Sequence, residues 1–285
     1  MHYPLRVISP FFNAFLGRMF FDSPEPLWLT GQPYGGTPLM ELNVSNRLQR
    51  RMYYFPKAWG KWYAERPLAR MLAQQLMPGS VFVDVGANLG FFSLQAAELV
   101  GPQGGVWSFE PEPDTFECLE RNARLHGFPQ MRCFNLALAD ENGNLSFHRD
   151  WYDGSSSLIP ERPGQASRYR DSVQVCVRTL DALVQEHALE VQKIRLIKID
   201  VEGAEARTVG GMIETLAQAS YPDLWIEVRG PRGSERAPDT FFEVDRQLGE
   251  LGYRAYRWAE GRNRPVRARD VVGREDILFR RDSRR

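Results

Sequence analysis

The chain has 285 residues, of which 43% are hydrophobic and 25% are charged, as is typical of a globular protein with a full core. Lysine and arginine total 36, and aspartate and glutamate also total 36, so the formal net charge is zero. This balance argues against partners that require a basic surface, such as nucleic acid or an anionic membrane.

The first 21 residues are apolar and aromatic, but Pro4, Pro10 and Asn13 interrupt them. No stretch is long and apolar enough to predict a membrane-spanning helix, and no cleavage pattern of small residues predicts a signal peptide. We expect this segment to act as a lid, as a substrate segment or as a contact in a homodimer, and a position on a membrane surface is the less favoured alternative.

Residues 22–38 are rich in proline and glycine and therefore predict a loop. Short strands are expected at 41–44 and 51–55, and a helix is expected at 58–76, where Pro78-Gly79 ends it. Residues 1–78 are therefore interpreted as an N-terminal extension.

From residue 79 to residue 285 the pattern alternates strands with helices, which favours a mostly parallel sheet. Strands are predicted at 81–85, 106–109, 132–136, 196–200 and 224–228, with a closing antiparallel pair at 253–258 and 276–279. Helices are predicted at 90–100, 180–187 and 239–251, with a further helix that begins near Ala204 and breaks at Gly210-Gly211. The expected fold is α/β, a doubly wound, Rossmann-like sheet of seven strands.

Another helix is expected to begin at Asp114, because Glu117 three residues later would complete a capping box. Residues 142–178 are expected to form an insertion into the main domain. Within it, 145–148 and 173–177 alternate like edge strands, and the polar loop 153–171 lies between them. This loop would cover a ligand pocket.

A strand followed by a glycine turn and a helix occupies residues 81–100. In doubly wound folds this arrangement holds a nucleotide-like cofactor at the carboxyl edge of the sheet. A dinucleotide site has three glycines as G-x-G-x-x-G, whereas this turn reads D-x-G-x-x-x-G from Asp84 to Gly90. The spacing favours a ligand with an ammonium and a carboxylate, and S-adenosylmethionine (SAM) is the candidate.

Three of the predicted strands end in an acid, namely Asp84, Glu110 and Asp200. Asp84 could face the methionine ammonium of SAM, directly or through water, and the helix after the turn could donate N–H groups to the carboxylate. Glu110 could accept hydrogen bonds from both ribose hydroxyls. A site for NAD would use the same ribose acid, so Glu110 alone indicates an adenosine ligand.

Six sequence blocks span roughly residues 80–230, and they read DVGANLGFFS, FEPEPDTFECLERNARLHG, FNLALAD, VRTLDAL, IKIDVEGAEARTVGG and IEVRG. In their order and spacing these blocks resemble the FkbM-type family of SAM-dependent methyltransferases. The resemblance implies a class I methyltransferase fold and transfer of a methyl group to a hydroxyl. It also implies a small-molecule, sugar, glycan or lipid acceptor.

The resemblance further implies where SAM would bind. Its methionine part would lie against Asp84, Gly86, Ala87, Asn88, Gly90 and Ser93, and its ribose against Glu110 and Pro111. The adenine would be bordered by Asn135, Ala137, Leu138 and Asp140, where the apolar side chains form a wall and the carboxylate accepts the adenine amino group. Asp200 and Glu202 would lie beneath the transferring methyl.

A hydroxyl is a poor nucleophile at neutral pH, so a general base or a metal is expected. Asp200 and Glu202 are the first candidates for the base, although Asp200 could instead only hold the SAM ammonium, and His148 is the next candidate. Asp200, Glu202 and Glu227 would also suit Mg²⁺, but the sequence lacks a tight ligand cluster with histidine, so a metal is not favoured.

Three alternatives are left open. A nucleic-acid methyltransferase is disfavoured by the neutral charge and by D-V-E-G at residues 200–203, where N-P-P-Y or D-P-P-Y would be expected. The other two are different classes of protein. An NAD-dependent oxidoreductase is disfavoured by the absence of a third glycine, and a non-catalytic scaffold with a SAM fold is disfavoured by the intact turn and acids. The three cysteines, Cys118, Cys133 and Cys176, are far apart and odd in number, so we expect buried free thiols in a cytoplasmic protein.

Overall fold

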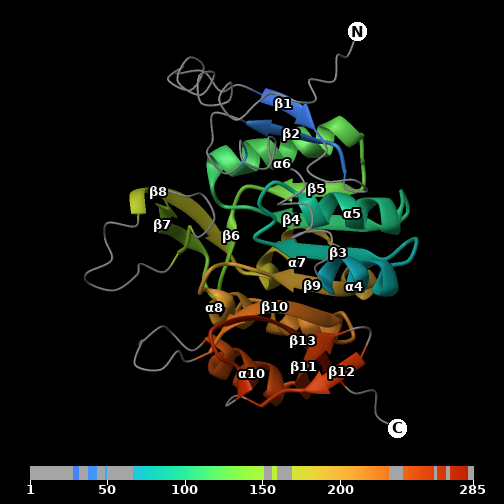
Figure 1. Ribbon diagram of the computed structural model, residues 1–285, viewed down its shortest axis with the longest axis vertical. Coiled ribbons are helices and arrows are strands. Elements are labelled where there is room, and N and C mark those ends of the chain that lie inside the picture. Colours follow the sequence, from blue (N-terminus) through green and yellow to red (C-terminus); the bar gives the residue numbers. More distant parts are fainter. Residues whose placement is uncertain are drawn as a thin grey trace, which may run out of the picture.

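The computed structural model in Figure 1 describes residues 28–31, 38–43, 49, 67–150, 156–158, 169–230, 240–259, 262–267 and 270–281. The expected N-terminal lid or dimer segment and the strand expected at 51–55 lie outside the described residues. So does most of the loop 153–171.

The centre of the protein is a sheet of eight strands in the order β12-β11-β13-β10-β9-β3-β4-β5. Five neighbouring strands are parallel, namely β10 (Asp223–Arg229), β9 (Ile194–Ile199), β3 (Val81–Val85), β4 (Gly105–Phe109) and β5 (Met131–Phe134). Three antiparallel strands complete the sheet, namely β13 (Arg274–Arg281), β11 (Tyr253–Ala259) and β12 (Arg262–Pro265). The expected doubly wound α/β fold and the closing antiparallel pair are therefore confirmed.

Within the described residues, the sheet has eight strands, one more than the sequence predicted. The additional strand β12 reads R-N-R-P, and all four of its residues are exposed. A strand at the edge of a sheet needs no buried face, so it leaves no alternating apolar pattern in the sequence.

Helices cover both faces of this sheet. One face packs against α4 (Pro67–Gln75), α5 (Phe91–Val100) and α6 (Pro113–His126). The other face packs against α7 (Leu180–His187), α8 (Glu205–Gly210), α9 (Ile213–Gln218) and α10 (Thr240–Glu250), with the short helix η2 (Val191–Lys193) before β9. Because both faces are covered, β3 and β4 are buried at every position, as expected for central parallel strands.

The start of α6 differs from the prediction. The side chain of Glu112, not that of Asp114, caps the helix by accepting a hydrogen bond from the backbone N–H of Thr115 at 2.7 Å. Pro113 is the first helical residue, a position where the missing N–H of proline costs nothing. The helix therefore begins one residue before the predicted start at Asp114. The break between α8 and α9 at Gly210-Gly211 is confirmed.

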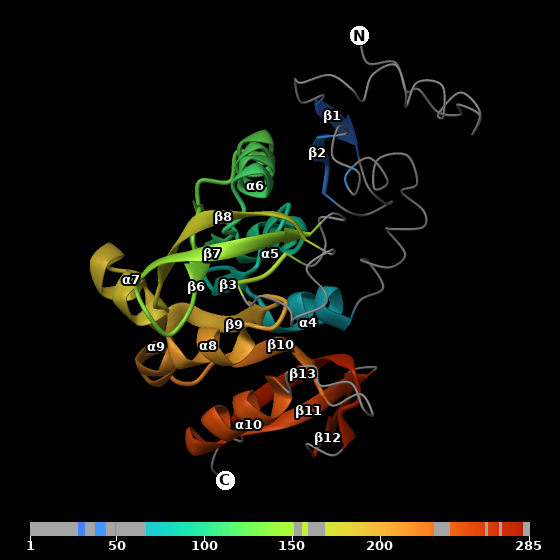
Figure 2. The same cartoon turned by 90° about the vertical axis from the view of Figure 1, so that its left-hand side faces the viewer.

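A second, smaller sheet is formed by β6 (Ala137–Leu138), β8 (Tyr169–Arg178) and β7 (Gly143–Asp150), in the order β6-β8-β7. Strands β7 and β8 pair antiparallel, as their alternating pattern predicted. In Figure 2 this hairpin lies on the side that faces the viewer.

The N-terminal part contains a hairpin that the sequence did not predict. β1 (Trp28–Gly31) pairs with β2 (Met40–Asn43), so the loop expected at 22–38 is wrong for residues 28–31. Met40 and Leu42 are fully buried in the same core cluster as α6, which attaches the hairpin to the main domain.

The three cysteines are free, as expected. Cys118 is buried, but Cys176 is exposed, so the expectation that all three are buried is wrong. Among the described helices, none is both long enough and apolar enough to cross a membrane.

Candidate active site

The glycine turn between β3 and α5 lies directly against the end of β9. A Cβ atom added at Gly86 would lie 2.0 Å from the carbonyl oxygen of Asp200, and the backbone φ of Gly86 is +73°. Both observations require glycine here. The turn is also bonded to β4, because the N–H groups of Gly86 and Ala87 donate to the carbonyl of Phe109 at 3.0 and 2.9 Å.

The first turn of α5 provides backbone donors at this edge of the sheet. Its N-cap residue, Gly90, has a φ of +88° and no side chain that caps the helix. The first N–H groups of a helix have no partner within the helix, so they can bind an anion such as a carboxylate.

Glu110 follows β4 and is 6% exposed. Its Oε2 accepts the N–H of Asn88 at 2.9 Å, and its Oε1 accepts the N–H of Glu112 at 3.0 Å. Burial raises the pKa of Glu110 to about 7, against these two backbone hydrogen bonds, which lower it. A carboxylate oxygen has two lone-pair sites, so both oxygens can still accept hydroxyl donors.

The carboxylate of Asp84 lies behind the glycine turn and is fully buried. Its Oδ2 accepts the hydroxyl of Ser93 at 2.6 Å, and its Oδ1 lies 3.1 Å from Nζ of Lys198. This second contact is an ion pair without the angle of a hydrogen bond. Ser93 is also fully buried, so both residues support the turn from within the protein.

The expected adenine segment follows β5. The amide of Asn135 donates to the carbonyl groups of Glu110 and Pro111 at 2.9 and 3.2 Å, and so connects this segment to the expected ribose site. Ala137 and Leu138 form β6 and are buried. The carboxylate of Asp140 is half exposed and pairs with Arg207 at 2.8 Å.

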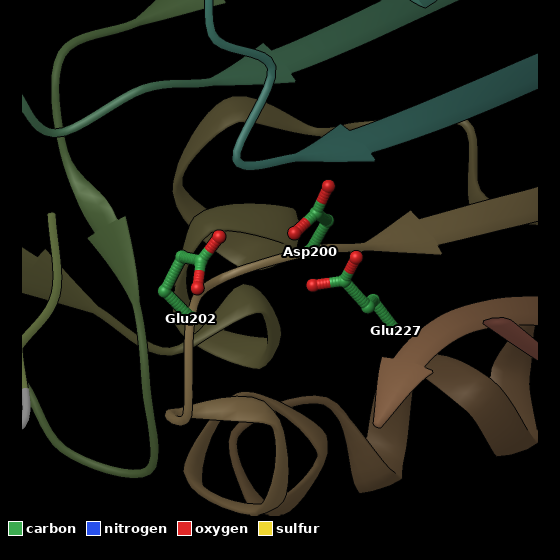
Figure 3. Close-up of side chains that lie close together, drawn as sticks. All are labelled: Asp200, Glu202 and Glu227. Atoms are coloured by element: carbon green, nitrogen blue, oxygen red, sulfur yellow. The ribbon is translucent and has the colours of Figure 1, made fainter. Parts of the chain in front are cut away.

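Asp200, Glu202 and Glu227 come together at the carboxyl ends of β9 and β10, as Figure 3 shows. One carboxylate oxygen from each lies within 4.8 Å of the others. Glu202 has a φ of +58°, a left-handed backbone conformation that residues other than glycine rarely adopt. Backbone strain of this kind is concentrated at functional sites. The following turn is held by Glu205, whose Oε1 accepts the N–H of Gly203 at 2.8 Å.

Asp200, Glu202 and Glu227 differ in their contacts with two arginines. Arg229, at the end of β10, and Arg274, at the start of β13, both contact Oε2 of Glu202, the former at 2.5 Å. Arg274 also lies 2.8 Å from Glu227 through its Nε. Among the described residues, Asp200 has no arginine partner; Nζ of Lys198 lies 4.0 Å from its Oδ2, and its side chain is 27% exposed.

The β7–β8 hairpin reaches this edge of the sheet at two points. The hydroxyl of Ser157 donates to the backbone carbonyl of Glu202 at 2.9 Å, and Ser157 is 2% exposed. Arg149 of β7 lies 3.4 Å from Glu112, the cap of α6. The insertion is thus bonded both to the acidic cluster and to the turn beside Glu110.

His148 belongs to this hairpin and exchanges two backbone hydrogen bonds with Ser157, at 2.9 and 3.0 Å. Directly opposite residues of a strand pair share a face, so His148 lies on the face of Ser157. Its proposed role as a base stays a prediction.

Sequence reasoning missed Lys198, Arg229 and Arg274. Lys198 had a local signal, since a lysine interrupts the apolar strand I-R-L-I-K-I immediately before Asp200. Arg274 had none, because it follows Glu202 by 72 residues and is brought to it only by the pairing of β13 with β10.

The parallel sheet, the glycine turn and the acid after β4 define a class I methyltransferase fold. Residues 84–255 match the methyltransferase FkbM domain, and the chain belongs to this family. The resemblance seen in the sequence is thereby confirmed, and SAM-dependent methyl transfer is the activity class of the fold.

Three named relatives are similar to parts of the chain. The 2-O-methyltransferase NoeI of Sinorhizobium fredii is 30% identical over 187 residues, which cover 61% of this chain and 74% of NoeI. The 31-O-demethyl-FK506 methyltransferase FkbM of Streptomyces tacrolimicus is 29% identical over 164 residues, covering 48% and 61% respectively. The hexuronic acid methyltransferase AglP of Haloferax volcanii is 27% identical over 158 residues, covering 55% and 60%.

Proposed function

We propose that the protein transfers a methyl group from SAM to a hydroxyl of a polar small molecule, sugar, glycan or lipid head group. Support comes from the family and from relatives whose names specify methylation at oxygen, 2-O-methyltransferase and 31-O-demethyl-FK506 methyltransferase. Charged groups surround the site, namely Asp200, Glu202, Glu227, Arg229 and Arg274, which favours an acceptor rich in hydroxyls over an apolar one.

The donor set along the strand ends fits SAM. The N–H groups at the start of α5, where no side chain caps Gly90, would bind the methionine carboxylate. Glu110, with acceptor capacity left on both oxygens, would bind the ribose hydroxyls. Ala137 and Leu138 would form the wall beside the adenine, as expected from the sequence. When bound, SAM supplies an activated methyl group on a sulfonium.

The task of the protein is then to align the acceptor and to accept its proton. We propose that Asp200 is the general base that accepts the proton of the acceptor hydroxyl. The observation that supports this choice is the absence of an arginine partner for Asp200 among the described residues, together with its 27% exposed side chain. Glu202, which contacts Arg229 and Arg274, would orient the acceptor side of the site instead.

The same arginines argue against a metal at the acidic cluster. Asp200, Glu202 and Glu227 are close enough to bind one cation. However, Arg274 bridges Glu202 and Glu227, and Arg229 adds a second positive charge at Glu202. The guanidinium groups supply the charge that Mg²⁺ would supply, so the arrangement does not fit a metal site and no step uses one.

The experiment is an assay of methyl transfer from radiolabelled SAM to a panel of sugars, lipids and polyketide-like alcohols. We expect label in at least one hydroxyl compound, and we expect Asp200→Asn to lower kcat about a hundred-fold or more while SAM still binds. Transfer to nitrogen or carbon only, or full activity of Asp200→Asn, would contradict the proposal. His148→Gln, assayed in parallel, tests whether His148 is the base instead.

A further inference from the structure

Lys198 is a buried cation beside the proposed SAM site. It lies one residue before the end of β9, and its side chain is 6% exposed. Its Nζ donates to the carbonyl of Gly86 at 2.6 Å and lies 3.1 Å from Oδ1 of Asp84. Burial of an ammonium is costly unless the ammonium is paired and hydrogen-bonded, and Lys198 meets both conditions.

The Lys198–Asp84 pair is fixed by a chain of buried hydroxyls. Ser93 of α5 donates to Asp84 at 2.6 Å, and Ser108 of β4 donates to Ser93 at 2.8 Å. Asp84, Ser93 and Ser108 are all fully buried. The chain therefore joins β3, β4, α5 and β9 at one point beneath the glycine turn.

The backbone segments around Lys198 are closely packed against each other. Gly86 approaches the carbonyl of Asp200 so closely that a Cβ would lie 2.0 Å from it. The N–H of Asp200 donates to the carbonyl of Val85 at 3.1 Å, and Nζ of Lys198 lies 4.0 Å from Oδ2 of Asp200. Lys198 thus contacts the turn on one side and the proposed base on the other.

We propose that Lys198 is a positioning residue, which holds the Gly86 turn and Asp200 in a fixed relation. This inference rests on the proposed function, because the turn would bind SAM and Asp200 would receive the proton of the acceptor. In-line transfer requires the donor and the acceptor to be aligned, and a displacement of about 1 Å can cost about a hundred-fold in rate. Lys198 controls that alignment without contacting the reacting atoms.

A purely structural role predicts a different result. If Lys198 only neutralised the buried carboxylate of Asp84, removal of both charges would restore Tm and would raise kcat well above that of Lys198→Met. If Lys198 positions the turn and Asp200, removal of both charges restores stability but not alignment. The double variant Asp84→Asn/Lys198→Met therefore separates the two roles.

The test compares the full-length wild type with Lys198→Met, with the double variant and with Lys193→Met. Lys193 is a matched control because its ammonium pairs with Glu190 on the surface, near the other end of β9. The measurements are Tm, the Kd of SAM by calorimetry, and kcat and KM with the best alcohol of the acceptor panel.

We expect Lys198→Met to lower Tm, to weaken SAM binding about tenfold and to lower kcat about a hundred-fold, with a smaller change in the KM of the acceptor. The double variant should regain Tm but keep the low kcat, and Lys193→Met should match the wild type. If Lys198→Met does not fold, the double variant alone decides the test.

Recovery of kcat together with Tm in the double variant would overturn the positioning role, as would wild-type kcat in Lys198→Met. Failure of the wild type to bind SAM would instead overturn the proposed function. The two failures are therefore distinguishable.

Discussion

Glu110 and Asn88 are 22 residues apart in the sequence, and the carboxylate of Glu110 accepts the backbone N–H of Asn88 at 2.9 Å. This bond connects the expected ribose acid at the end of β4 to the glycine turn after β3. Asn88 has a φ of +52°, a conformation that asparagine tolerates better than most residues. The two halves of the proposed SAM site are thus in direct contact.

The affinity for SAM should depend on pH through Glu110. Burial raises the pKa of Glu110 from 4.5 to about 7, and the charges of Glu112 and Lys198 act on it in opposite directions. Only the carboxylate form can accept both ribose hydroxyls. We therefore expect the Kd of SAM to rise as the pH falls below about 7, approaching tenfold per pH unit.

Calorimetric titration with SAM between pH 5.5 and 8.5 checks this expectation. Glu110→Gln should bind SAM weakly at every pH and should lose most of the dependence. An unchanged dependence in Glu110→Gln would assign the titration to another group.

Without ligand, the same group affects folding. Because its folded pKa is raised, Glu110 holds its proton more tightly in the folded than in the unfolded state. Its contribution to stability is therefore fully present below about pH 4.5 and is lost as the pH rises through about 7. Thermal unfolding of wild type and Glu110→Gln should show a smaller loss of Tm over this window in the variant.

Gly86→Ala should be more damaging than an ordinary glycine substitution. Its new Cβ would collide with the carbonyl of Asp200, in addition to the strain of a positive φ. Gly127→Ala is the matched control, since Gly127 has a φ of +61° and nothing within 4 Å of the added atom. The control should cost about 1–2 kcal/mol, from strain alone.

We expect Gly86→Ala to lose more Tm than Gly127→Ala and to lose SAM binding. Thermal unfolding and calorimetry measure both effects. Equal losses of Tm in the two variants, with SAM binding retained, would contradict the close contact between the turn and β9.

Ser157 should affect the acceptor rather than SAM. Its hydroxyl anchors the insertion to the backbone of Glu202 at 2.9 Å. Ser157→Ala removes this bond, which is worth about 1 kcal/mol, so the KM of the acceptor should rise about fivefold with the Kd of SAM unchanged. Ser146→Ala is the control, because Ser146 is exposed on the same hairpin and accepts a bond from Gln174. A change in SAM affinity alone would reject this division of roles.

Addition of a metal chelator should have little effect on the rate of methyl transfer. Arg229 and Arg274 already balance the charge of Glu202, and Arg274 also contacts Glu227. Steady-state assays with and without a chelator test this expectation. Strong inhibition that Mg²⁺ reverses would show that a cation displaces the arginines.

The sequence was most informative where local chemistry decides the structure. The turn from Asp84 to Gly90 was predicted because glycine tolerates a positive φ, which Gly86 and Gly90 adopt. The break at Gly210-Gly211 was predicted because glycine is unfavourable inside a helix. The parallel order of the central strands followed from their alternation with helices.

The remaining features depend on pairing between distant segments. β1 lies in a stretch rich in proline and glycine and became a strand only through pairing with β2. Arg274 reaches Glu202 because β13 pairs with β10. Neither the sequence before Glu202 nor the sequence around Arg274 contains this information, so the sequence alone offered no reason to propose Asp200 over Glu202 as the base.

The most direct test of the account is single-turnover transfer from SAM with a deuterated methyl group, followed by identification of the methylated atom. Wild-type protein should place the label on an oxygen of the best panel alcohol. Asp200→Asn should bind SAM with near wild-type affinity and transfer the label about a hundred-fold more slowly or worse. Label on another element, or unimpaired transfer by Asp200→Asn, would contradict the account.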